Sequence, residues 1–247
     1  MLEKIVEGAE VGGGDLVVEV GPGVGALTQA LAKRAGHVVA VELDKTLVPV
    51  LSDLFAGWPV TVVQGDILKI DLPALAKPYA HMNIKAVANL PYYITTPVIF
   101  RLLEGETAFE SITVMVQKEV ANRMTAKPGT KDYGGLTLAI KYYADASLVA
   151  NVPVNCFMPR PGVSSAVVKL DVLEKPRVDA DKEVFFKTVK AAFGKRRKTL
   201  VNCLEGFGRS KVELEELLAK LGISPSSRGE TLDIYAFGVL AKALGGV

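Results

Sequence analysis

The sequence has few of the residues that hold small secreted or metal-dependent folds together. It contains two cysteines, Cys156 and Cys203, and two histidines, His37 and His81. They are too few for a disulfide framework and are not in a zinc-binding spacing. No apolar run approaches the roughly 20 residues that cross a bilayer, and the first ten residues do not resemble an export signal. We therefore expect a cytoplasmic protein with no metal site and no membrane contact.

Neither sign of charge is in large excess, because the formal net charge is only +2. This value is too small to indicate a partner by itself. The distribution is more informative, since "KAAFGKRRKTL" places four basic residues together at 195–198. Such a run is often only a solvated surface, and the sequence leaves that alternative open.

Apolar residues make up 49% of the 247 positions, enough for a substantial core. Short β-branched runs alternate with helical periodicity from residue 15 to about 117. The runs are Leu16–Val20, His37–Leu43, Val60–Gln64, Ile84–Leu90 and Ser111–Gln117. Near-continuous apolar strands separated by helices indicate a parallel sheet covered on both faces. A later run, 164–173, predicts one antiparallel strand, and the whole pattern predicts an open, doubly wound α/β fold.

The pattern of apolar residues changes after "LEKPRVDADKE". Helical spacing predicts helices at 182–193, 211–221 and 232–244, and β-branched runs disappear. We therefore predict an α/β domain at 1–174 and a small all-α domain at 175–247.

A glycine turn joins the first predicted strand to a helix in "VEVGPGVGALT", through Gly21, Gly23 and Gly25. Glycines allow a tight turn and close approach of a ligand to the backbone at the helix start. The spacing G-x-G-x-G is one residue shorter than the dinucleotide fingerprint, so a pyrophosphate is not the expected ligand. A glycine turn without any ligand is the alternative.

An acidic residue, Glu42, ends the second predicted strand, and another, Asp66, follows the third. Glu42 can accept hydrogen bonds from ribose hydroxyls, and Asp66 can accept one from an adenine amino group. Acids in such positions can also simply cap helices. Two of them behind a glycine turn favour a nucleoside without a 2′-phosphate. S-adenosylmethionine fits best, because its sulfonium tolerates a nearby carboxylate such as Glu19.

The stretch "VANLPYYITTP" ends the fourth predicted strand beside this site. The Asn89 side-chain oxygen and the Leu90 carbonyl can hold the two hydrogens of an exocyclic base amine and favour the geometry of attack. Pro91 fixes the backbone, and Tyr92 offers a flat face to an extruded base. The alternative is a strand ended by proline, followed by core tyrosines.

Several motifs together carry a resemblance to a family. They are "VEVGPGVGALT", "VELDK", "GDIL", "NLPYYITTP", "VQKEVANRM", "FMPRPGVSSAVVKL", "KRRKTLVNCL" and "RGETLDIYAF". Their order resembles that of the ribosomal RNA adenine N6-dimethyltransferases, more closely the small-subunit enzymes than their erythromycin-resistance relatives. The resemblance implies a class I methyltransferase fold and S-adenosylmethionine as donor. It also implies dimethylation of two adjacent adenosines near the 3′ end of small-subunit rRNA, in ribosome biogenesis.

The resemblance also implies roles for individual residues. It assigns Glu42 to the cofactor ribose, Asp66 to its adenine, and residues 89–92 to the target base. Phe157 matches an aromatic that packs on that base from the other side, although alone it also reads as a core residue. The expected cofactor-binding residues are Glu19, Gly21, Gly23, Gly25, Glu42, Leu43, Asp66, Ile67 and Asn89. The expected RNA-binding residues are Lys118, Arg123, Arg160, Lys195, Arg196, Arg197 and Lys198.

One departure concerns the start of the sequence. Family members carry a basic segment and a Gly-Gln-Asn-Phe-Leu stretch before the first strand, and this sequence begins after it. We expect the sheet to fold, with weaker cofactor binding and turnover. We also expect a monomer that binds the small ribosomal subunit and its rRNA.

Two other functions remain open at this point. A protein-glutamine N5-methyltransferase positions an amide-type nitrogen with Asn-Pro-Pro-Tyr, but Leu90 replaces the first of those prolines here. A non-catalytic RNA-binding assembly factor could keep the same fold, although the intact "NLPY" is against it.

Overall fold

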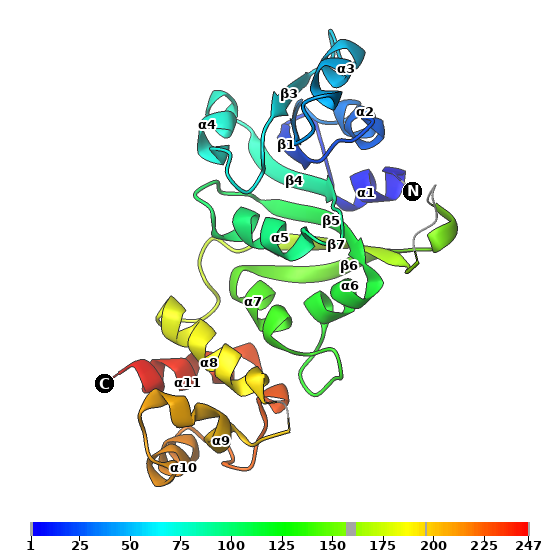
Figure 1. Cartoon of the computed structure of the whole chain (residues 1–247). Helices are drawn as coiled ribbons and strands as arrows, with labels where there is room; N and C mark the ends of the chain where they lie inside the picture. The colour runs from blue at the N-terminus through cyan, green and yellow to red at the C-terminus, as the bar shows by residue number, and fades with distance from the viewer. Residues whose placement is uncertain (1, 157–161, 196, 247) are drawn as a thin grey trace. The chain divides into compact units, whose positions relative to one another are not determined.

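The computed structural model describes residues 2–156, 162–195 and 197–246 (Figure 1). The chain divides into two compact units. The first, the sheet unit, comprises Met1–Ala121 and Asp145–Val172. The second, the helical unit, comprises Asn122–Ala144 and Leu173–Val247. No helix among the described residues is both long and apolar enough to cross a membrane.

A seven-stranded sheet forms the first unit, in the order β3-β2-β1-β4-β5-β7-β6. Four of the strand pairs are parallel, whereas β5 and β7 pair antiparallel. The strands are β1 (Asp15–Val20), β2 (His37–Glu42), β3 (Val60–Gln64), β4 (Asn83–Asn89), β5 (Ser111–Gln117), β6 (Ala144–Val152) and β7 (Ser165–Val172). The predicted doubly wound fold, with its antiparallel strand, is therefore confirmed.

Helices connect and cover these strands. They are α1 (Leu2–Gly8), α2 (Ala26–Ala32), α3 (Leu47–Leu54), α4 (Leu72–Ala76), α5 (Thr95–Glu104) and the first half of α6 (Lys118–Thr125). Residues of α1 and α2, such as Ile5 and Leu31, share one apolar cluster with Val17, Val87 and Val167 of the strands. Helix α5 packs on β5 and lies in front of the sheet in Figure 1. This burial of apolar area on the sheet supplies most of the driving force for folding the unit.

The register of the parallel strands aligns their carboxyl ends. Val20 of β1 is level with Val41 of β2 and with Ala88 of β4. Glu42, one residue further along β2, is level with Gln64 of β3. Glu42 and Asn89, the last residues of their strands, and the glycine turn and Asp66, which follow theirs, therefore all lie at one edge of the sheet, the edge where open parallel sheets bind ligands.

The helical unit is built from the end of α6 and from five further helices. These are α7 (Gly135–Tyr143), α8 (Lys182–Gly194), α9 (Leu200–Leu204), α10 (Lys211–Lys220) and α11 (Ile234–Gly245). Short polar side chains start three of them: the Asp181, Ser210 and Asp233 oxygens accept backbone N–H bonds from the first turns of α8, α10 and α11. Single 3₁₀ turns lie at Lys77–Tyr79, Val154–Cys156, Glu205–Phe207 and Gly229–Thr231.

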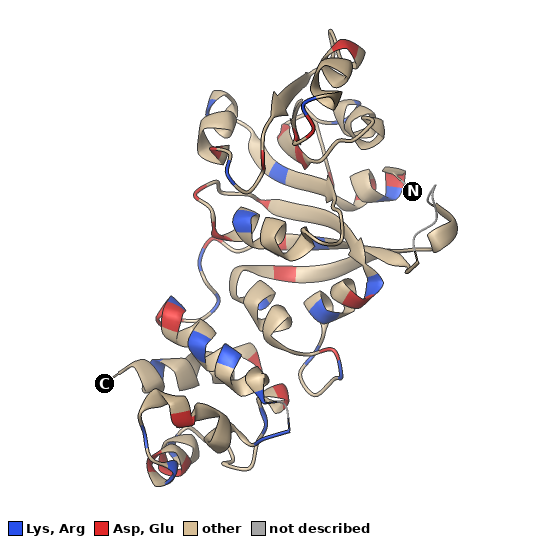
Figure 2. Cartoon of the chain, in the orientation of Figure 1, with Lys and Arg blue, Asp and Glu red and all other residues tan. Residues whose placement is uncertain are grey.

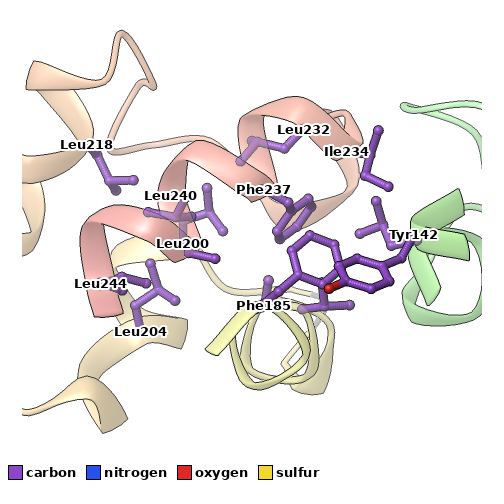
Figure 3. Close-up of a cluster of buried hydrophobic side chains, with 14 of the residues drawn as sticks. Tyr142, Phe185, Leu200, Leu204, Leu218, Leu232, Ile234, Phe237, Leu240 and Leu244 are labelled. Carbon is purple, nitrogen blue, oxygen red and sulfur yellow. The ribbon is translucent and has the colours of Figure 1, made fainter. Parts of the chain in front are cut away.

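Figure 3 shows the apolar core of the helical unit, where Phe185, Phe237 and Tyr142 lie together among leucines. The ring centroids of Tyr142 and Phe185 are 4.9 Å apart. The buried hydroxyl of Tyr133 donates to the Leu232 carbonyl oxygen at 2.8 Å, which satisfies both groups. Because Tyr133 and Tyr142 belong to this core, residues 122–144 pack with the C-terminal helices, a grouping that the sequence did not predict.

The sequence prediction included neither strand β6 nor helices α7 and α9. The other observed strands agree with the predicted runs to within one residue at either end. The three predicted C-terminal helices correspond to α8, α10 and α11, with the last one beginning two residues later than expected.

Candidate active site

The glycine turn after β1 has the conformation that only glycine adopts readily. Gly21, Gly23 and Gly25 have φ angles of 71°, 56° and 83°. A Cβ at Gly25 would stand 2.8 Å from the Phe55 ring, so this glycine is needed for packing. At Gly21 and Gly23 no atom lies within 4 Å of the Cβ position. These two glycines therefore leave open space beside the start of α2.

Glu42 is buried, and its carboxylate is hydrogen-bonded both to the glycine turn and to the backbone just after its own strand. Its Oε2 accepts a hydrogen bond from the Gly23 N–H at 3.2 Å, and its Oε1 accepts one from the Asp44 N–H at 2.8 Å. Each carboxylate oxygen has a further lone pair, so the group can still accept hydrogen bonds from a ligand. The residue thus both holds the turn and remains available as an acceptor.

Asp66 lies in the turn after β3 and is half-buried. Its Oδ1 accepts from the Leu68 N–H at 3.0 Å, and its Oδ2 is 3.7 Å from the ammonium of Lys69, which is well exposed. The hydrogen bond to Oδ1 fixes the direction of the carboxylate, and Oδ2, the outer oxygen, has only the long contact with Lys69. An ion pair this exposed contributes little energy.

A cavity of about 380 Å³ opens at this edge of the sheet, within the range of small-molecule sites. Seven of the predicted residues line it: Gly21, Glu42, Leu43, Asp66, Ile67, Leu90 and Pro91. The sequence reasoning missed another seven: Val20, Val41, Asp44, Gly65, Tyr93, Ile94 and Val98. Most of these seven residues are direct sequence neighbours of the quoted motifs, and this proximity was the one signal by which the sequence could have predicted them. Val98 of α5 also lines the cavity, but the position of this helix depends on how it packs on the sheet.

Asn89 is the exposed last residue of β4, directly before buried Leu90. The carbonyl oxygen of Pro91 accepts hydrogen bonds from the Ile94 N–H at 3.1 Å and the Thr95 hydroxyl at 3.2 Å, which fixes the turn into α5. The short loop between strand and helix is therefore held by one backbone bond and by the Thr95 side chain, and Asn89 is exposed beside it.

The two tyrosines of this stretch differ in their surroundings. The Tyr92 hydroxyl is 2.9 Å from the Ser165 hydroxyl of β7, which anchors a ring that is 39% exposed. Tyr93 is 84% exposed and borders the cavity. Neither is a core residue, so the alternative of core tyrosines is wrong.

Glu19 lies inside the protein, two residues before Gly21. It is 1% exposed, and neither carboxylate oxygen has a hydrogen-bond partner of good geometry among the described residues. Burial raises the pKa of Glu19 to about 7; the nearby Thr28 hydroxyl acts in the opposite direction, and the Glu42 carboxylate adds to the rise. Glu19 does not border the cavity itself.

The predicted basic residues divide between two places. Lys118 and Arg123 are exposed on α6. Lys195, Arg197 and Lys198 are exposed between α8 and α9, in the helical unit, and Figure 2 shows further basic positions along α8. Phe157, Arg160 and Arg196 lie outside the described residues.

The site fits S-adenosylmethionine on three counts that the structure supplies. The turn leaves space at two glycines, the cavity is bordered by the Glu42 and Asp66 carboxylates, which keep acceptor capacity, and the buried carboxyl of Glu19 lies two residues before the turn. Strand order and site together define a Rossmann-like, class I methyltransferase that uses this cofactor.

Comparison with known proteins narrows the class to a family. The family model for ribosomal RNA adenine dimethylase matches residues 1–237. The chain belongs to this family. Ribosomal RNA small subunit methyltransferase A of Alkaliphilus oremlandii is 49% identical over 250 residues, covering 99% of this chain and 87% of that protein. The protein of the same name from Clostridioides difficile is 48% identical over 248 residues, covering 99% and 86%.

Two solved structures that resemble this chain are also rRNA or adenosine methyltransferases. A dimethyladenosine transferase from Plasmodium falciparum superposes with a TM-score of 0.82 at 27% identity, covering 97% of this chain and 93% of that one. The 23S rRNA methyltransferase ErmE gives 0.76 at 26% identity, covering 98% and 96%. The chain is accordingly an enzyme that dimethylates rRNA adenine with S-adenosylmethionine.

Proposed function

We propose that the enzyme transfers two methyl groups to N6 of each of two adjacent adenosines near the 3′ end of small-subunit rRNA. The observation that carries this proposal is the exposed Asn89 amide at the end of β4, next to a cavity bordered by Glu42 and Asp66. The relatives named ribosomal RNA small subunit methyltransferase A support the choice of ribosomal subunit.

Cofactor binding is assigned to the ends of the first three strands. Glu42 accepts the ribose hydroxyls with the lone pairs that its two backbone bonds leave free. Asp66 accepts the adenine amino group through its outer oxygen, and Leu43 and Ile67 flank the base. Gly21 and Gly23 give the methionine part close access to the backbone. When bound, the cofactor supplies an electrophilic methyl group on a positively charged sulfur.

Asn89 and Leu90 position the target amine. The Asn89 side-chain oxygen and the Leu90 carbonyl accept its two hydrogens, so that the nitrogen becomes pyramidal and its lone pair is less delocalised into the ring. Tyr92, anchored on Ser165, presents its ring to the extruded base. Phe157 is proposed as the opposite face. The nitrogen gains the methyl group and then loses one proton to solvent, so an uncharged Asn89 is sufficient.

Binding of rRNA is assigned to basic side chains. Lys195, Arg197 and Lys198 form an exposed basic segment, and Arg196 belongs to the same run of sequence. Phosphate contacts of this kind hold the register of the RNA and carry no sequence information. Lys118 and Arg123 on α6, and Arg160, are proposed to add to them. We further propose that the enzyme acts as a monomer in the cytoplasm, where the small subunit is assembled.

The test uses small subunits that lack the modification, incubated with the enzyme and S-adenosylmethionine. N6,N6-dimethyladenosine is then measured by mass spectrometry, with the modified nucleotides located by fragment mapping. We expect two adjacent dimethylated adenosines with the unaltered chain. Asn89→Ala should lower the rate about a hundredfold, comparable to loss of one positioned hydrogen-bonding group in other active sites.

Asn83→Ala is the matched control, because Asn83 is also exposed and lies at the other end of the same strand. It should leave the rate unchanged. Subunit binding without methylation by the unaltered chain would instead support a non-catalytic assembly factor. Methylation at another position in the rRNA would refute the proposed target while leaving the activity in place.

A further inference from the structure

Arg101 is a partly buried side chain to which the assigned roles give no part. It lies in the last turn of α5, and its Nη2 donates a hydrogen bond to the carbonyl oxygen of Ile70 at 2.9 Å. The two residues are 31 positions apart in the sequence. Ile70 belongs to the loop 65–71 between β3 and α4, which also carries Asp66. The bond therefore connects α5 to the loop that is proposed to hold the cofactor adenine.

Ile70 is coupled to Asp66 within this loop by short hydrogen bonds. The N–H groups of Ile70 and Lys69 donate to the Asp66 carbonyl oxygen at 2.9 and 2.8 Å. The side chain of Ile70 also packs over the start of the loop, since a Cβ on Gly65 would be 2.8 Å from Ile70 Cδ1. A displacement of Ile70 therefore moves the backbone of Asp66 and changes the direction of its carboxylate.

A second cavity, of about 380 Å³, opens between the loop and the end of α5. Ile70 and Asp71 line it from the loop, and Arg101 and Glu104 line it from the helix. Because this space is open, the hydrogen bond rather than packing holds the loop to the helix there. Hydrogen bonds from a charged donor are among the stronger ones in proteins, and partial burial shields this one from water.

Helix α5 gives Arg101 a fixed position relative to the cofactor cavity. Its Val98 and Ile99 are buried in the core, and Val98 also lines the cavity. Asp66 and Ile67 line the same cavity from the loop. Arg101 follows Val98 by three residues, so its guanidinium sets the loop against a helix whose own place is decided by packing on the sheet.

We propose that Arg101 is a positioning residue for the adenine of S-adenosylmethionine. By holding the Ile70 carbonyl, it directs the Asp66 carboxylate toward the exocyclic amine of the base. The inference rests on the proposed contact between Asp66 and adenine. A carboxylate accepts a hydrogen bond from this amine but repels the 6-oxo group of hypoxanthine, so a well-directed Asp66 selects adenosyl over inosyl ligands. Arg101 is thereby a determinant of cofactor selectivity.

Isothermal titration calorimetry of the full chain with S-adenosylhomocysteine and with S-inosylhomocysteine tests this directly. The unaltered chain should bind the adenosyl form about thirtyfold more tightly, or better. Arg101→Met should weaken binding of the adenosyl form about tenfold and that of the inosyl form by less than about twofold. The preference for adenine should therefore fall about fivefold or more.

Two more variants complete the test. Lys77→Met is the control for loss of a positive charge, because Lys77 is exposed directly after α4 and lies outside the loop. It should leave both Kd values unchanged. Arg101→Gln replaces the guanidinium by an amide that is too short to reach the Ile70 carbonyl, so it should lower the preference by the same factor. This variant decides the question if Arg101→Met does not fold.

The possible outcomes separate the inference from the function on which it rests. Equal losses of affinity for the two ligands, or no loss for either, would overturn the inference, because the preference for adenine would then not depend on Arg101. An unaltered chain that binds both ligands equally well would refute the contact between Asp66 and adenine, and the inference with it. No binding of either ligand would instead refute the cofactor site.

Discussion

The protonated Glu19 carboxyl makes the stability of the free protein depend on pH in a defined direction. Its pKa is raised from the ordinary 4.5 to about 7 by burial, against an opposing effect of the Thr28 hydroxyl and with an addition from Glu42. The folded state therefore holds this proton more tightly than the unfolded state. The associated stability is fully present below pH 4.5 and is lost as the pH rises through 7. Between pH 5 and pH 8 the loss is on the order of 2 to 3 kcal/mol.

Glu19→Gln removes this dependence, because the amide does not titrate. The difference in unfolding free energy between variant and wild type should shift by roughly 2 to 3 kcal/mol in favour of the variant from pH 5 to pH 8. Comparing the two proteins cancels the contributions of the other titrating groups. Any constant cost of burying the amide also cancels, since it is present at both pH values.

The assay is urea unfolding followed by tryptophan fluorescence, without cofactor. Trp58 is the one tryptophan of the sequence and lies in the sheet unit, where its ring is 6.1 Å from that of Phe55. It therefore reports on the unit that contains Glu19. With a slope of about 2 kcal/mol per molar urea, the midpoint difference should move by about 1 M. Parallel pH profiles for the two proteins would show that Glu19 is ionised in the folded state and refute the reasoning.

Three further predictions concern other sites. Gly25→Ala forces a Cβ into Phe55 at 2.8 Å and strains a φ of 83°, so it should cost about 2 kcal/mol or more in urea unfolding; an unchanged midpoint would show that the turn can rearrange. Tyr133→Phe leaves the buried carbonyl of Leu232 unpaired and should cost about 1–2 kcal/mol, measured on the helical unit by near-UV circular dichroism; a neutral effect would mean that water replaces the hydroxyl. Lys198→Ala should reduce the slope of log Kd for subunit binding against log salt by about one, and an unchanged slope would exclude a phosphate contact.

The strands of the sheet could be read from the sequence because their signal is strong and local. Residues such as Val17, Val39 and Val114 are buried in near-continuous β-branched runs, and each run ends at a Gly, Pro or polar residue. The carboxyl ends of parallel strands meet at one edge, so the placement of Glu42 and Asp66 at a common site followed from topology.

Other elements depend on contacts that a local pattern does not contain. Strand β6 lies at the end of the strand order, and most of its residues are partly or fully exposed, so it lacks an apolar run. Helix α9 has five residues, too few for a periodic pattern. The position of Tyr142 in the helical core depends on Phe185, more than forty residues later in the sequence.

The site shows a similar division. The sequence predicted Glu42 as a ligand-binding acid, but its hydrogen bonds to Gly23 and Asp44 arise from the three-dimensional arrangement of turn and strand. The burial of the Glu19 carboxyl could not be predicted either, since it depends on neighbours from other strands and from α2.

The helical unit is made of two stretches of the chain that are separated by the last part of the sheet unit, and this has a consequence for synthesis of the protein. Helix α7 is complete at residue 143, but its apolar face is covered by helices that end with α11, which starts at residue 234. At the usual speed of translation, about 5 to 20 residues per second, this face waits roughly 5 to 20 seconds for its partners. Meanwhile, the residues of the sheet unit are all synthesised by residue 172. A nascent chain of this enzyme thus passes through a period in which one half can fold while the other exposes a surface that chaperones recognise.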